Sequence, residues 1–120
     1  RYLYITGRSS DMYISGGSNV YPREIEEIML THPALSEVAI LGAPHPRWGE
    51  VGVAVCTCEP GQSVTPEDLA QMLEQKLAKY KLPHHYVFLD EMPKTGYGKI
   101  TKKLVREELE AQGIWPGEGP

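Results

Sequence analysis

The sequence has few of the residues that build disulfide frameworks, metal centres or membrane spans. Only two of its 120 residues are cysteines, and Cys56 and Cys58 stand two apart in a segment of strand-like composition. A bridge between them would close too small a ring, and two thiols are too few for a structural zinc site. We therefore expect reduced thiols, no metal site and a reducing, cytoplasmic location.

Long apolar runs and a strongly basic charge are also missing. No apolar run exceeds a few residues, so we expect no transmembrane segment. The net charge is −4, but the segment 76–106 holds eight basic and two acidic residues, a net +6, and the remainder is −10. An acidic chain with one basic segment is not expected to bind nucleic acid, whereas that segment suits a small polyanion.

The apolar patterns predict a small α+β domain over residues 1–111 and a loose tail over 112–120, which includes Trp115. Strands are expected at 2–5, 12–14, 37–41, 51–58 and 86–89, loops at 15–19, 42–49 and 93–98, and helices from Pro22, from Thr65 and over 101–110. The spacing of Leu69, Leu73, Leu77 and Tyr80 predicts that the second helix continues to about residue 80. This order has too few crossovers for a doubly wound parallel sheet, so we expect a mainly antiparallel sheet covered by helices.

One loop presents a lysine between glycines and a helix. It resembles a phosphate loop, but Pro93 stands where that motif needs glycine, and Ile100 stands where it needs serine or threonine. Lys99 is therefore either a solvated surface lysine or a cation that a flexible loop presents to developing negative charge.

Two further stretches are rich in glycine and polar residues. Arg8 lies in the first, at 7–11, and Gly16 and Gly17 lie in the second, at 15–19. The second leads to a helix N-terminus, where backbone N–H groups can meet an anion or a narrow ligand, but both stretches are also compatible with ordinary turns. Trp48 lies in a turn, where an indole either stacks on a base or caps the core.

Taken in order, five motifs resemble those of the C-terminal lid domain of AMP-forming acyl-CoA synthetases, which are adenylate-forming enzymes. The motifs occupy residues 4–8, 15–22, 47–50, 80–83 and 93–100, and the resemblance covers residues 1 to about 109. It implies a mobile α+β lid that works with a large N-terminal domain missing from this chain. Alone, the fragment is expected to have little activity.

The resemblance also implies a reaction in two steps. A small carboxylic acid and ATP give an acyl-adenylate and pyrophosphate, with Mg²⁺ bound mainly by the missing N-terminal domain. The lid then rotates, and CoA attacks the adenylate to give the thioester.

The family's functional residues carry over to matching positions of this sequence. Lys99 matches the adenylation lysine, Arg8 matches the arginine at the nucleotide ribose, and the hinge falls at Ser10 and Asp11. The CoA and pantetheine channel is matched by Gly16, Gly17, Trp48, Tyr80 and Lys81. The chain departs from the family at Ser10, where aspartate or lysine is common. It departs again after Lys81, where Leu82, His84 and His85 replace the further basic residues of some relatives.

Two alternatives remain open at this point. The chain can be the lid of an adenylation domain that loads a carrier protein, which the sequence on either side of it would show. It can also be a non-catalytic module that binds anions or nucleic acid, which salt-sensitive binding to RNA or DNA would show.

Overall fold

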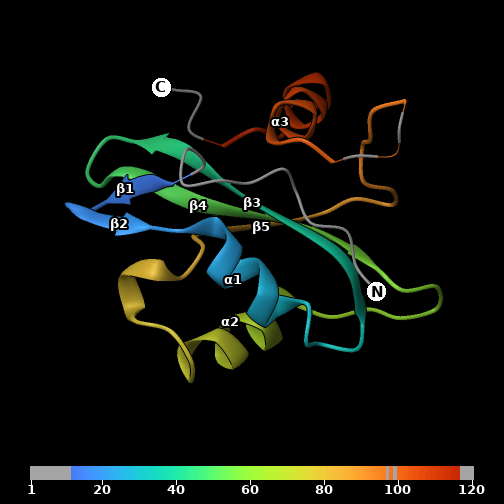
Figure 1. Ribbon diagram of the computed structural model, residues 1–120, viewed down its shortest axis with the longest axis horizontal. Coiled ribbons are helices and arrows are strands. Elements are labelled where there is room, and N and C mark those ends of the chain that lie inside the picture. The colour runs from blue at the N-terminus through green and yellow to red at the C-terminus, as the bar shows by residue number, and fades with distance from the viewer. Residues whose placement is uncertain (1–11, 97, 99, 117–120) are drawn as a thin grey trace.

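A computed structural model describes residues 12–96, 98 and 100–116 of the chain, and Figure 1 shows their arrangement. The five strands of one sheet are β1 (Tyr13–Ser15), β2 (Ser18–Val20), β3 (Leu35–His45), β4 (Gly49–Cys58) and β5 (His85–Phe88). The helices are α1 (Pro22–Met29), α2 (Pro66–Glu74), the 3₁₀ turn η2 (Lys79–Lys81) and α3 (Lys102–Ala111). Helices α1 and α2 cover one face of the sheet, and α3 covers the other (Figure 1). The predicted α+β fold with a mainly antiparallel sheet is confirmed.

The long hairpin of β3 and β4 forms the middle of the sheet. It pairs antiparallel from Leu35 opposite Cys58 to His45 opposite Gly49. Strand β1 joins the beginning of β4, and β5 runs parallel to the second half of β4. Among the described strands, β3 therefore has one free edge, which matters for the site below.

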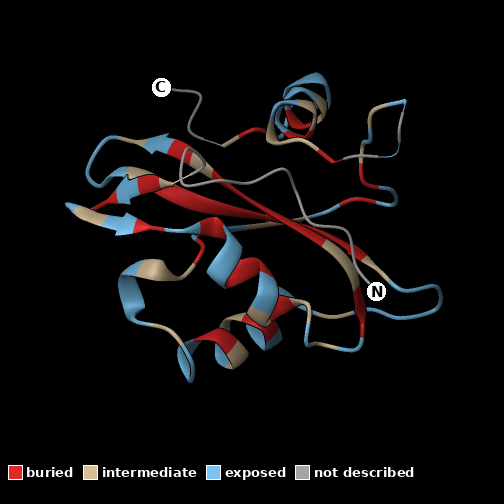
Figure 2. Ribbon diagram, in the orientation of Figure 1, coloured by how far each residue is buried: buried red, intermediate tan, exposed pale blue. Residues whose placement is uncertain are grey.

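Both faces of the sheet are buried along most of its two middle strands, β3 and β4 (Figure 2). Along β4, Val53 and Val55 pack in the cluster beneath α3, whereas Ala54 and Cys56 pack in the cluster beneath α1 and α2. This period of two follows from the alternation of side chains in a strand, and burial on both faces explains why the strand is apolar throughout. The sheet is thus a packed platform that carries loops at its two ends.

Side-chain caps begin two of the helices where the sequence predicts. The hydroxyl of Thr65 accepts a hydrogen bond from the Asp68 amide at 3.1 Å, and the hydroxyl of Thr101 accepts one from the Leu104 amide at 3.2 Å. Each satisfies an amide that has no partner within the helix.

The second helix is shorter than its apolar spacing predicts. Helix α2 ends at Glu74, and Ala78 is extended with φ −62° and ψ 150°, so Leu77 and Tyr80 lie beyond it. Tyr80 belongs to η2, which contacts β2. Tertiary contacts of this turn thus override the local helical pattern.

Two segments predicted as loops contain strand residues. Ser15 and Ser18 pair across the β1–β2 hairpin, and Gly42 to His45 continue β3. A Cβ atom at Gly42 would lie 2.7 Å from the Cβ of Tyr13. Only glycine therefore lets the backbone of β3 approach the Tyr13 side chain so closely.

The tail is not loose at Trp115. The indole is 6% exposed and packs in the cluster beneath α3, with the Arg106 guanidinium 4.7 Å from the ring centroid. Burial of so large an apolar side chain outweighs the entropy of the short segment that carries it. Residues 117–120, like the strand predicted over 2–5, lie outside the described residues.

Candidate functional site

The two glycines of the β1–β2 turn have backbone conformations that favour glycine. Gly16 has φ +59° and Gly17 has φ +86°, as a two-residue type I′ hairpin requires. The Gly16 amide donates a hydrogen bond to the Trp48 carbonyl at 2.9 Å. A Cβ atom at Gly16 would lie 3.1 Å from Cε3 of Trp48, whereas one at Gly17 would meet nothing within 4 Å. The hairpin therefore lies directly against the indole on one side and is open on the other.

An open pocket of about 480 Å³ lies beside this hairpin. Its lining residues come from three distant parts of the sequence: Ser15, Gly16, Trp48, Lys79, Tyr80 and His84. Trp48 is 41% exposed and Tyr80 is 44% exposed, so neither ring is part of the core. The structure thus brings together three residues assigned from the sequence, Gly16, Trp48 and Tyr80.

The turn that carries Trp48 is held by a histidine. Nδ1 of His45 accepts hydrogen bonds from the Arg47 amide at 3.0 Å and the Trp48 amide at 3.2 Å. In this arrangement Nδ1 carries no proton. The Arg47 guanidinium lies 5.3 Å from the centroid of the Trp48 ring. These contacts orient the indole at the mouth of the pocket.

Lys79 and His84 line the pocket and were not assigned from the sequence. Lys79 precedes the motif at 80–83, and His84 was noted only as a departure from the family. The break after α2 brings both residues to the hairpin. Partial loss of hydration lowers the pKa of His84, whose side chain is still largely exposed, and the nearby His45 and His85 add to this shift. Burial and then His45 lower the pKa of His85 in the same way.

Lys81 is placed differently from its neighbour Tyr80. Its ammonium lies 3.0 Å from Oε1 of Glu24 on α1, and this hydrogen bond raises the pKa of Lys81. Lys81 does not line the pocket. It ties the η2 turn, and with it Tyr80, to the first helix.

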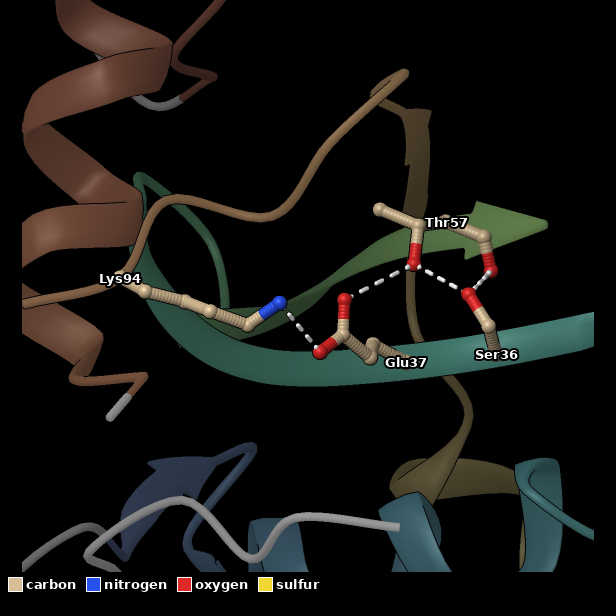
Figure 3. A network of polar contacts seen from close by, with 4 residues as sticks. All are labelled: Ser36, Glu37, Thr57 and Lys94. Atoms are coloured by element: carbon tan, nitrogen blue, oxygen red, sulfur yellow. Dashed lines mark hydrogen bonds and ion pairs between the residues drawn. The ribbon is translucent and has the colours of Figure 1, made fainter. Parts of the chain in front are cut away.

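The loop before α3 is tied to the sheet at the other end of β3. Nζ of Lys94 lies 2.8 Å from Oε2 of Glu37, and Oε1 of that carboxylate accepts from the Thr57 hydroxyl at 3.4 Å (Figure 3). Ser36 joins the network through Thr57, with 2.8 Å between the two hydroxyl oxygens (Figure 3). Lys94 is thus an anchor of the loop.

The far side of the same loop is fixed by burial. The Gly98 amide donates to the Thr95 carbonyl at 2.9 Å, closing a turn in which Gly98 has φ +80°. Ile100 is 1% exposed and packs beneath α3. Lys99 stands between them in sequence and lies outside the described residues, as do Arg8, Ser10 and Asp11.

Neither a metal cluster nor a membrane span is found in the described part of the chain. Over residues 12–96, 98 and 100–116, no three His, Cys, Asp or Glu side chains gather closely enough to hold a metal ion. No helix in those residues is long and apolar enough to cross a membrane.

Comparisons with known proteins match most of the chain, including all of β3, to one family. Residues 24–99 match the model for the AMP-binding enzyme C-terminal domain. The chain is 46% identical over 106 residues to indoleacetate–CoA ligase from Aromatoleum aromaticum, covering 88% of this chain and 21% of that protein. Its fold matches a fatty acyl CoA synthetase from Mycobacterium tuberculosis with a TM-score of 0.80 and 39% identity, covering 91% of this chain and 22% of that one.

A second solved structure agrees. ATP-bound MatB from Rhodopseudomonas palustris matches with a TM-score of 0.80 and 36% identity, over 87% of this chain and 21% of that one. The chain thus spans about a fifth of the length of the relatives that it matches. Because the family match covers more than half of it, the chain belongs to the AMP-binding enzyme C-terminal domain family.

Proposed function

We propose that this chain is the mobile lid of an acid–CoA ligase, which activates a carboxylic acid with ATP and transfers the acyl group to CoA. One observation carries the proposal: the two assigned regions lie at opposite ends of β3. Glu37 anchors the lysine loop, and His45 orients Trp48 eight residues further along the strand. At the rise of an extended chain, these residues are about 26 Å apart. Because one reaction centre meets only one end at a time, the lid turns between the two steps.

In the first step, a carboxylate oxygen attacks the α-phosphorus of ATP and pyrophosphate leaves. The Lys99 ammonium lies between the carboxylate and the α-phosphate, where it orients the two groups and offsets the charge of the transition state. Arg8 binds the nucleotide ribose, and Ser10 and Asp11, which follow it in the sequence, form the hinge. Mg²⁺ would enter with ATP and be held mainly by the N-terminal domain, as the family resemblance implies.

In the second step, the sulfur of CoA attacks the acyl carbonyl, the thiol proton passes to solvent and AMP leaves. The Gly16–Gly17 turn borders the path of the pantetheine arm. The exposed rings of Trp48 and Tyr80 offer faces on which the adenine of CoA stacks. Lys81 steadies this site through Glu24.

The full-length protein tests the proposal. It is incubated with ATP, CoA and a panel that includes indole-3-acetate, a long-chain fatty acid, and short and aromatic acids. Mass spectrometry should detect one acyl-CoA, with AMP and pyrophosphate in equal amounts. ADP in place of AMP would contradict adenylation, and the absence of any acyl product across the panel would contradict a ligase. Transfer only to a phosphopantetheine carrier protein would replace CoA as the acceptor.

A further inference from the structure

Glu26 is a buried acidic side chain that neither step of the proposed reaction uses. It lies on α1 and is 7% exposed. Its Oε2 atom accepts a hydrogen bond from the Ile40 amide at 2.8 Å and forms an ion pair with the ammonium of Lys102. That ammonium also donates to the Ile40 carbonyl. One carboxylate and one ammonium thus pair both backbone groups of a single residue on the free edge of β3.

This three-way contact joins the two faces of the sheet. Glu26 comes from α1 on one face, and Lys102 is the first residue of α3 on the other (Figure 1). The two charges are far apart in sequence, separated by 76 positions, and meet at the edge strand. Since buried charges are costly without partners, the contact fixes where α3 begins relative to β3.

The beginning of α3 is also the end of the lysine loop. Lys102 follows Lys99 by three positions, and between them Ile100 is buried and Thr101 caps the helix. At the other end of the loop, Lys94 is paired with Glu37. Both ends of the loop are therefore tied to β3, at Glu37 and at Ile40, which are about 10 Å apart along the strand.

We propose that Glu26 and Lys102 are positioning residues for the adenylation step, acting through the Lys99 loop. The inference rests on the proposed role of Lys99. A cation that orients two reacting groups must be held to within a fraction of an ångström, and a misplacement of about 1 Å can cost about 100-fold in rate. The clamp of Glu26, Lys102 and Ile40 is about 17 Å along β3 from His45, so it has no direct contact with the thioester end.

The test uses the Lys102→Met variant of the full-length protein. Its substrate is the carboxylic acid that the unchanged protein converts in the panel described above. Adenylation is measured by ATP–pyrophosphate exchange and the thiol step by acyl-CoA formation from supplied acyl-adenylate. We expect kcat for adenylation to fall between about tenfold and about 100-fold, with KM for ATP and the thiol step within about twofold. Lys102→Arg keeps the cation and should recover most of the rate. Equal losses in both half-reactions, or no loss, would overturn the inference.

Two further variants separate positioning from folding. Glu26→Leu combined with Lys102→Met removes both charges together, so no buried charge is left unpaired, and it should show the same split between half-reactions. Glu110→Gln removes an exposed ion pair with Arg106 on the same helix and should leave both half-reactions unchanged. Lys99→Ala distinguishes an error in the proposed role of Lys99 from an error in the proposed role of the Glu26–Lys102 clamp. If Lys99→Ala does not slow adenylation selectively, the proposed role of Lys99 is wrong. If Lys99→Ala slows adenylation selectively but Lys102→Met does not, only the proposed role of the clamp is wrong.

Discussion

The two ends of β3 are built in opposite ways. At the Glu37 end, ion pairs, a buried isoleucine and a helix cap hold the loop that leads to Lys99. At the His45 end, the Gly16–Gly17 turn and the exposed rings of Trp48 and Tyr80 leave an open pocket. A step that depends on one positioned charge needs a tethered loop, whereas a long flexible arm needs a smooth, open path. Under the proposed function, the tethered end suits the single positioned charge of Lys99, and the open end suits the flexible pantetheine arm.

The largest expected effect comes from removing the charge at the tethered end. Lys99→Ala should slow adenylate formation about 10²- to 10³-fold, because a cation aimed at the developing charge of a transition state contributes at about this level. Thioester formation from supplied acyl-adenylate should be largely spared. Pyrophosphate exchange and acyl-CoA formation, measured separately on the full-length enzyme, make the comparison. A parallel loss in both would mean that the two ends do not act in separate steps.

A smaller effect is expected from adding bulk at the open end. Gly17→Leu should slow the thiol step about tenfold or more and affect pyrophosphate exchange less, because its side chain enters the space that is open beside Gly17. Gly17→Ala is the matched control: it carries the same cost of a positive φ without the bulk. If both variants slow the two half-reactions equally, the turn serves only the fold. If pyrophosphate exchange suffers more, Gly16 and Gly17 do not border the thiol path.

Several features of the two ends could be predicted from the sequence. Those that could not depend on contacts between residues far apart in the chain. The loop at 93–98 and the helix over 101–110 were predicted, because turn residues and the apolar spacing of a helix are local signals. Strand β1 was predicted at 12–14, but most of β2 was predicted as part of the loop at 15–19, since a strand of three residues without apolar alternation has almost no pattern of its own. Neither the Lys94–Glu37 pair nor the Glu26–Lys102 pair could be predicted, because each depends on the register of β3 and on the side of the sheet to which a helix folds.

The pocket illustrates the same limit. Trp48 and Tyr80 were assigned from their motifs, but Lys79 and His84 join them only because α2 ends at Glu74 and the chain turns back. The exposure of Tyr80 could not be derived from spacing, since the apolar pattern placed it on the predicted second helix; for Trp48 the sequence left both an exposed ring and a core cap open.

The smallest expected effect is a loosening of the open end in mild acid. The pKa values of His84 and His85 are lowered in the folded protein, so the unfolded chain binds more protons as pH falls. The stability that these neutral imidazoles contribute is present above about pH 6.5 and is lost as pH falls through their lower folded values. His84→Asn should therefore reduce the loss of thermal stability between about pH 7 and 5, by no more than ~2 °C because both side chains are exposed. Proton NMR of the imidazoles checks the two pKa values directly. If the variant loses as much thermal stability in acid as the unchanged protein, His84 is not the source of the effect. If amide exchange rises first in the Lys94 loop, the acid-sensitive part of the domain is the tethered end and not the open end.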